Sequence, residues 1–525
     1  MSTNRKARMG VAVAVAVAII AANHVRHRPA PSPAPATASA GSAAPAAAVK
    51  PAPPASWKLG ALTLHACELG QPNSGRTTAA WCTRFEVPEN RDDPQGRRIR
   101  LRLAVVRSEA EVPAKDMLVF LAGGPGQAAT ENASAAVAAL GPLLAHRNLL
   151  LLDQRGTGGS HPLDCKDDSR DADADDASDD DPGRLKSEIQ RCLAQVEKTS
   201  DPRFYTTTVA AQDMEDVRKA LGSPTFDLVG VSYGTRMAQQ YLMHYPDAVR
   251  SVVLDGVVPN QLVLGEDFAR NLDDALKAQF ARCTADPACH KRFGDPYQTL
   301  YQLRDALRAN PHVVSFRDPQ SYRTVQRRLS EFSLASVVRM FAYTPATAAL
   351  LPLSIDAAAH GDVGPLLGQA KLLSGDLADT MNGGMQSSVI CSEDADLFTP
   401  RPEDKDTILG TRMIDALTTV CSVWPHGTRP KDFHDPLKSD KPVLLMSGQY
   451  DPVTPPRYGD EVLKGLTDAR HLVAPGQGHN VIAAGCMPKL VKRFVEDLKP
   501  KQLDASCLQR LQPTPMFIDF NGATP

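Results

Sequence analysis

The stretch FDLVGVSYGT, residues 226–235, decides the fold of this chain. Its apolar first part predicts a strand buried on both faces, and the residues from 235 to 245 have the apolar spacing of a helix. Ser232 has a glycine two positions away on each side, which removes side chains that would clash in a sharp strand-to-helix turn. The pattern predicts a nucleophilic serine at a helix N-terminus, where developing negative charge is stabilised. An ordinary Gly/Ser turn is the alternative.

Short apolar runs recur on both sides of this stretch without strict alternation, which is typical of strands inside a parallel sheet. Helical patterns such as 209–221 separate them, so they indicate an α/β fold with a mostly parallel, doubly wound sheet. From residue 260 to 436 the spacing is mostly helical, and we interpret this part as an inserted cap between core segments 57–259 and 437–525. The other expected strands are 101–106, 117–122, 148–152, 251–254, 442–446 and 471–474, and the expected cap helices are 272–283, 297–309 and 334–341.

The N-terminal residues 1–25 are typical of an export signal. Positive residues precede the apolar run 9–22, which suits a signal peptide and is too short to span a bilayer comfortably. An uncleaved N-terminal anchor is the alternative, and it would be the protein's one contact with a membrane. Residues 26–56 are rich in Ala and Pro, so we expect an extended linker and a folded part that begins near Trp57.

Ten cysteines follow the linker, and an even number agrees with export to the periplasm or the medium, where disulfides persist. Metal binding is not expected, because the chain has no Cys-x-x-Cys motif. The acidic tract 167–181 lacks EF-hand spacing, so a solvated loop is favoured over a calcium site. Sequence does not fix the connectivity, and the simplest pairing joins neighbours: Cys67–Cys82, Cys165–Cys192, Cys283–Cys289, Cys391–Cys421 and Cys486–Cys507.

The formal net charge is −2, which gives no reason to expect a nucleic acid or an anionic membrane surface as a partner.

A serine nucleophile needs a histidine base that an acid orients. After this motif the acid and then the histidine usually follow in the chain, each at the end of a later strand. The expected strand 442–446 leads to Asp451, and the strand 471–474 leads through a Gly-rich turn to His479. His471 opens its strand and would face the wrong edge of the sheet. We therefore expect Ser232, Asp451 and His479 to form a catalytic triad.

Two further assignments complete the expected site. Asp255 is the alternative acid, but Gly256 follows it, so a turn or cap role is the simpler interpretation. The oxyanion hole needs two backbone N–H groups, one from the residue after the nucleophile and one from a loop after an early strand. Tyr233 and Gly124 are the candidates. A plain Gly-Pro turn is the alternative for the loop 123–126.

These segments resemble a known family of enzymes. GGPG, DQRGTGGS and GVSYG are similar to motifs of the prolyl aminopeptidase branch of the α/β-hydrolases, and DPVTP and GQGH resemble its secreted tripeptidyl aminopeptidase (TAP-like) relatives. One departure is Ala122, where prolyl aminopeptidases usually carry His before the glycines. The resemblance extends from about Trp57 to Leu508. The five motifs are residues 123–126, 153–160, 230–234, 451–455 and 476–479.

The resemblance implies an α/β-hydrolase fold with a helical cap and an exported serine exopeptidase. Such an enzyme hydrolyses peptides near their free N-terminus, as a tripeptidyl or prolyl aminopeptidase, through an acyl-enzyme and without a cofactor or metal. It must recognise an ammonium group, for which Glu393 and Asp394 are candidates, although solvent exposure is the simpler expectation for each. Arg155 is expected to support a loop beside the site, with a surface salt bridge as the alternative.

Two other functions stay open at this point. A lipase or esterase could use the same triad, although the cap lacks a long apolar stretch and 5% of residues are aromatic. A non-catalytic binding protein could also retain the scaffold, but the complete triad and oxyanion loop argue against it.

Overall fold

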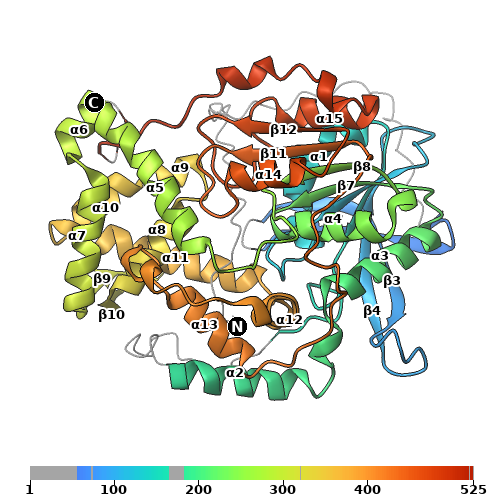
Figure 1. Cartoon of the computed structure of the whole chain (residues 1–525), viewed down its shortest axis with the longest axis horizontal. Helices are drawn as coiled ribbons and strands as arrows, with labels where there is room; N and C mark the ends of the chain where they lie inside the picture. The colour runs from blue at the N-terminus through green and yellow to red at the C-terminus, as the bar shows by residue number, and fades with distance from the viewer. Residues whose placement is uncertain (1–55, 73–74, 165–181, 320, 520, 524–525) are drawn as a thin grey trace, which may run out of the picture.

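The computed structural model describes residues 56–72, 75–164, 182–319, 321–519 and 521–523 (Figure 1). The expected signal segment, almost all of the linker and the acidic tract lie outside these residues, so those assignments stay predictions.

A large sheet forms the centre of the molecule. Among the described residues it has ten strands in the order β1-β2-β3-β4-β6-β5-β7-β8-β11-β12. From β6 to β12 all neighbours are parallel, whereas β1 to β4 and the β4–β6 pair are antiparallel. The strands are β1 Trp57–Leu59, β2 Leu62–Gly70, β3 Thr77–Pro88, β4 Arg98–Val106, β5 Met117–Leu121, β6 Leu149–Leu152, β7 Phe226–Val231, β8 Val249–Asp255, β11 Val443–Gly448 and β12 Ala469–Ala474.

Helices cover both faces of this sheet (Figure 1). One face packs against α1 and α15 through side chains such as Leu140 and Phe494. The opposite face packs against α3 and α4 through side chains such as Met214 and Met237. The helices of the core are α1 Ala133–Leu144, α2 Pro182–Val196, α3 Thr207–Leu221, α4 Tyr233–His244, α14 Pro456–Leu463 and α15 Met487–Asp497. This arrangement agrees with the expected doubly wound α/β fold.

The insertion after β8 contains two differently packed parts. Helices α5, α7, α8, α10 and α11 surround a core of their own, which includes Leu276, Leu300 and Val338 (left in Figure 1). Helices α12 and α13 instead contribute Val389 and Leu417 to the core beside the sheet. The elements are α5 Phe268–Ala285, α6 Pro287–Phe293, α7 Pro296–Ala309, β9 His312–Arg317, β10 Thr324–Leu329, α8 Glu331–Phe341, α9 Pro345–Ala348, α10 Leu351–Ala359, α11 Gly364–Thr380, α12 Gly383–Glu393 and α13 Arg412–Cys421.

Local sequence explains where these helices begin. Asp295 precedes α7, and its carboxylate accepts hydrogen bonds from the N–H groups of Tyr297 and Gln298. Pro296 is the first residue of the helix, where a missing N–H costs nothing. The hairpin β9–β10 was not expected in a helical cap. It is a separate two-stranded sheet at the edge of that part.

Four of the five neighbour pairs of cysteines form disulfides in the structure. Cys67–Cys82 joins β2 to β3, Cys283–Cys289 joins α5 to α6, Cys391–Cys421 joins α12 to α13, and Cys486–Cys507 closes the loop around α15. Cys165 lies outside the described residues, so its pairing with Cys192 stays a prediction.

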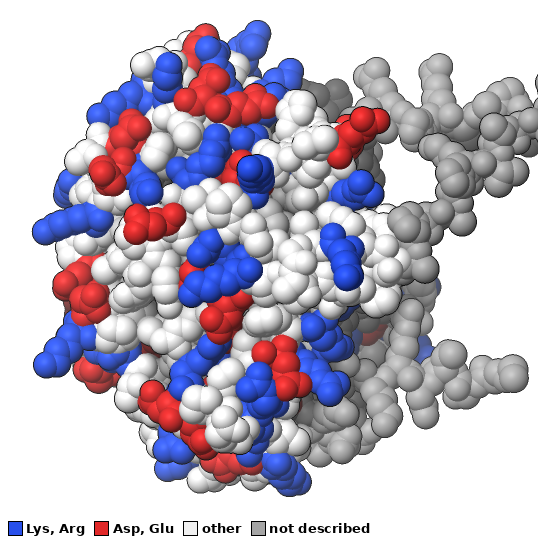
Figure 2. Space-filling model, turned by 90° about the vertical axis from the view of Figure 1, so that its right-hand side faces the viewer, with Lys and Arg blue, Asp and Glu red and all other residues white. Residues whose placement is uncertain are grey.

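The surface has no region dominated by one charge on the face in Figure 2, where acidic and basic residues are interspersed. None of the helices in the described part of the chain has the length and apolar character needed to cross a membrane. Within those residues no three His, Cys, Asp or Glu side chains converge as metal ligands.

Candidate active site

Ser232 lies on the strained turn that joins β7 to α4. Its backbone has φ +56° and ψ −125°, a region that residues other than glycine rarely adopt. A Cβ on Gly230 would lie 2.4 Å from the carbonyl oxygen of Gly234, and one on Gly234 would lie 2.1 Å from that of Leu121. Only glycine therefore fits at the two motif positions. Ser232 N donates to the carbonyl of Asp255 at 2.8 Å, which holds the turn against the end of β8.

His479 and Asp451 form a buried hydrogen-bonded pair at the ends of β12 and β11. Nδ1 of His479 lies 2.7 Å from Oδ2 of Asp451, and both side chains have no exposed surface. The other carboxylate oxygen accepts from the N–H groups of Val453 and Thr454, each at 2.8 Å. The N–H of His479 donates at 2.7 Å to the carbonyl of Tyr343, two residues after α8. The insertion thus touches the histidine loop directly.

These contacts keep Asp451 ionised. Burial raises the pKa of its carboxyl, but the imidazole of His479 and the hydrogen-bond donors outweigh burial, so the pKa lies below its usual 3.8. Because the carboxylate is an acceptor, it fixes the His479 tautomer with the proton on Nδ1. Nε2 of His479 is buried and has no hydrogen-bond partner among the described residues. This atom is therefore available to accept a proton.

Ser232 and His479 are neighbours across the end of β8. A Cβ on Gly256 would lie 3.0 Å from Cε1 of His479, and the preceding residue accepts the hydrogen bond from Ser232 N. Within the described part of the chain, the Ser232 hydroxyl makes no hydrogen bond to Nε2 of His479. Catalytic hydrogen bonds of this kind often align only when substrate binds.

Asp255, the alternative acid, has other partners. Its carboxylate accepts from the N–H groups of Val481 and Ile482 at 2.9 Å, just beyond His479. Burial raises its pKa to about 6, although the two N–H donors act in the opposite direction. The geometry therefore joins Asp451 to the imidazole and Asp255 to the backbone of the histidine loop. His471 lies within β12 and hydrogen-bonds Asp460 and Ser447.

The glycine-rich loop after β5 lies against the serine. A Cβ on Gly123 would come 3.1 Å from Cβ of Ser232, and Gly124 has φ +110° and a cis bond to Pro125. Tyr233 is the first residue of α4, so its N–H has no acceptor within the helix. Both expected oxyanion donors therefore come from backbone that borders Ser232.

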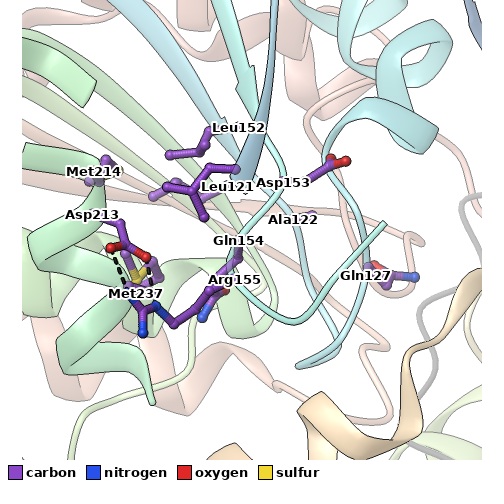
Figure 3. A pocket seen from close by; sticks show the side chains of 12 residues that line it. Leu121, Ala122, Gln127, Leu152, Asp153, Gln154, Arg155, Asp213, Met214 and Met237 are labelled. Atoms are coloured by element: carbon purple, nitrogen blue, oxygen red, sulfur yellow. Dashed lines mark hydrogen bonds and ion pairs between the residues drawn. The ribbon is translucent and has the colours of Figure 1, made fainter. Parts of the chain in front are cut away.

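Arg155 is fully buried, so the alternative of a surface salt bridge is wrong. Its guanidinium binds both oxygens of Asp213 at 2.7 Å (Figure 3). It also donates to the carbonyls of Glu89 and Phe204 at 2.8 and 2.9 Å. The side chain ties the loop after β6 to α3 and β3. It lines a small cavity of ≈ 20 Å³, roughly the space of one water molecule, that also reaches Ala122 of the oxyanion loop.

Glu393 and Asp394 are completely buried, so the expectation of solvent exposure is wrong for both. Glu393 accepts hydrogen bonds from the N–H of Thr207 at 2.6 Å and from its hydroxyl at 2.9 Å. Burial raises the pKa of Glu393 to about 8. Asp394 pairs with the buried Arg236 at 2.9 Å. The proposed role of either acid in ammonium binding stays a prediction.

Comparisons of sequence and structure found similar proteins. Serine protease Hip1 of Mycobacterium tuberculosis (strain ATCC 25618 / H37Rv) is 26% identical over 465 residues, which are 82% of this chain and 87% of that protein. Tripeptidyl aminopeptidase of Streptomyces lividans is 30% identical over 195 residues, 34% of this chain and 35% of that protein. The solved structure of proline iminopeptidase from Mycobacterium smegmatis has 18% identity and a TM-score of 0.36, covering 79% of this chain and 98% of its own.

The family described as "alpha/beta hydrolase fold" matches residues 116–484. This span begins just before β5 and ends after the histidine loop, so it contains Ser232, Asp451 and His479 in the expected order. The chain belongs to the α/β-hydrolase family.

Proposed function

We propose that the protein is an exported serine exopeptidase, which hydrolyses peptide bonds near the free N-terminus of peptides through an acyl-enzyme. The observation that carries this proposal is the buried Asp451–His479 pair beside Ser232 on its strained turn. Among α/β-hydrolases the choice of a peptidase is supported by the names of the relatives, serine protease and tripeptidyl aminopeptidase.

The chemistry follows from the positions of these groups. Ser232 attacks the peptide carbonyl while Nε2 of His479 takes the hydroxyl proton, and Asp451 stabilises the resulting imidazolium without taking a proton itself. The N–H groups of Tyr233 and Gly124 bind the oxyanion of the tetrahedral intermediate. The imidazolium then gives its proton to the leaving amine. In the second half of the reaction, Nε2 of His479 takes a proton from a water molecule, whose oxygen attacks the acyl carbonyl. The imidazolium then returns the proton to the Ser232 oxygen as the ester bond breaks and the acid product leaves.

The low exposure of the site, which residues of the insertion contact, supports the preference for the ends of peptide substrates. Ser232 is 3% exposed and His479 is 6% exposed. Tyr343 contacts the histidine loop, and its ring lies edge-on to the His479 imidazole at 5.4 Å. Asn382, which precedes α12, contacts Gly126 of the oxyanion loop. A site enclosed from two sides admits a peptide terminus more readily than the middle of a folded chain.

Export is supported by two independent features. Residues 1–25 have the pattern of a signal peptide. Four disulfides are distributed over the sheet edge, the insertion and the C-terminal helix. Disulfides at several separate positions persist in oxidising compartments.

The test compares aminomethylcoumarin peptides of one, two and three residues, each with a free and an acetylated N-terminus. We expect acetylation to lower kcat/KM by orders of magnitude, because a buried ammonium site would be left half-paired. The best length would distinguish the single-residue from the tripeptidyl type. Ser232→Ala is the control for contaminating peptidases. Equal cleavage of blocked and free peptides would refute the exopeptidase, and a strong preference for p-nitrophenyl esters would favour an esterase on the same triad.

A further inference from the structure

Helix α12 is connected at both of its ends to residues that carry the expected oxyanion donors or lie beside them. Asn382 precedes its first residue and Glu393 is its last. Asn382 contacts the oxyanion loop directly, whereas Glu393 is connected to Tyr233 through Thr207. At the first end, the N–H and the side-chain amide of Asn382 both donate to the carbonyl of Gly126 at 3.0 Å. A Cβ on Gly126 would lie 2.8 Å from the carbonyl of Asn382, so the two segments are in close contact. Gly126 belongs to the same tight turn as Gly124.

At the other end, a chain of hydrogen bonds connects Glu393 to Tyr233. Glu393 accepts from the N–H and hydroxyl of Thr207, and the Thr207 hydroxyl lies 2.6 Å from the hydroxyl of Tyr233. Nε2 of Gln154 donates to the same tyrosine hydroxyl at 3.1 Å. Tyr233 is fully buried, so these polar contacts define where its side chain lies. The backbone of this residue supplies the second N–H of the expected oxyanion hole.

The helix itself is held firmly between these contacts. Residues 388–393 are all buried. Trp424 Nε1 donates to the hydroxyl of Ser388 at 2.9 Å, and Cys391 is bonded to Cys421 of α13. Gly384 N donates to the carbonyl of Leu163 at 3.0 Å, which anchors the first turn. A displacement of α12 would therefore be transmitted to the residues at its ends.

We propose that α12 positions both oxyanion donors, with Asn382 holding the Gly124 turn and Glu393, through Thr207, holding Tyr233. Both are positioning residues, because neither touches the reacting atoms. The inference rests on the proposed function, since it assumes catalysis through this oxyanion hole. It also gives Glu393 a role different from binding the substrate ammonium group.

The test measures kcat and KM for Asn382→Ala, Glu393→Leu and Glu393→Gln with two substrates. One is the best free-amine peptide, and the other is p-nitrophenyl acetate, which has no ammonium group. We expect Asn382→Ala and Glu393→Leu to lower kcat about 10- to 100-fold with both substrates, with KM nearly unchanged, because a displaced donor stabilises the transition state less. Glu393→Gln should lose less, since its amide oxygen still accepts from the N–H of Thr207.

A double-mutant cycle separates positioning from a general loss of structure. Tyr233→Phe removes the hydroxyl but keeps the backbone N–H. If Glu393 acts through Tyr233, adding Glu393→Leu to Tyr233→Phe should cost little more than the worse single change. Glu403→Leu and Asn310→Ala are matched controls at exposed positions of the insertion and should leave kcat unchanged. Melting curves of every variant establish that it is folded.

The outcomes are distinct. A loss confined to the free-amine peptide would overturn the proposal and assign Glu393 to ammonium binding. Unchanged kcat in the folded variants, or losses that multiply with Tyr233→Phe, would also overturn it. If Ser232→Ala retained the activity, the proposed function itself would fail, so the two failures are distinguishable.

Discussion

Two buried carboxylates lie at the ends of neighbouring parallel strands, close to the same histidine. Their pKa values are shifted in opposite directions. Asp451 follows β11 and has a pKa below 3.8, whereas Asp255 ends β8 and has a pKa raised to about 6. Burial raises the pKa of both. The difference is the partner: Asp451 contacts an imidazole and a hydroxyl in addition to two backbone N–H groups, whereas among the described residues the Asp255 carboxylate accepts from backbone N–H groups. Position on the sheet therefore selects candidate acids, and the partner determines what each can do.

The largest expected effect tests this division of roles at the triad. Ser232→Ala and His479→Ala should each lower kcat by about 10⁴-fold or more, because the three residues act as a unit. Asp451→Asn should cost a similar factor, since the amide leaves the His479 ring in the wrong tautomer. Steady-state kinetics with the best free-amine peptide measures the losses. A mild Asp451→Asn combined with an inactive Asp255→Asn would reverse the assignment of the acid.

A smaller effect is expected at Asp255. Asp255→Asn replaces one acceptor oxygen with a donor that faces the N–H groups of Val481 and Ile482. The loop that carries His479 should shift, with a loss in kcat of about tenfold, as expected for a small displacement of a catalytic group. One lost buried hydrogen bond should also lower the free energy of unfolding by about 1–3 kcal/mol. Kinetics and denaturant melts measure the two effects, and a stable variant with the parental kcat would show that the contact is dispensable.

Sequence reasoning predicted the positions in the fold of the candidate site residues that lie in motifs. Ser232 and His479 stand beside glycines in turns after apolar strands, and Asp451 follows another such strand, so local pattern and chain order were enough for these positions. It missed the half-exposed strands β1 to β3, in which buried and exposed residues mix along each strand. It also missed the packing of α12 against the sheet core, because nothing local distinguishes that helix from those of the cap.

Contacts between distant segments explain the other misses. Glu393 was expected to be exposed, yet its partner Thr207 is 186 positions away and no motif marks the pair. Asn382 and Gly126 are 256 positions apart. Charged residues next to a cysteine in a helical region are usually solvated, and only the folded chain shows which partners cover them. An alignment that revealed covariation between such positions would supply the missing signal.

The smallest expected effect is the pH dependence of stability, in which the two acids have opposite signs. The pKa of Asp451 is lowered on folding, so its contribution is present above about pH 4 and is lost as the pH falls. The pKa of Asp255 is raised from 3.8 to about 6, so its contribution is full below pH 3.8 and is lost as the pH rises through 6.

The neutral side chain of Asp255→Asn cannot ionise. The stability of wild type relative to this variant should therefore decrease between about pH 4 and 6 and stay level above 7. Denaturant melts at pH 4, 5, 6 and 7 measure the difference. A difference that is flat across this range would mean that Asp255 is ionised in the folded protein as readily as in the unfolded chain, and the contrast between the two carboxylates would then be lost.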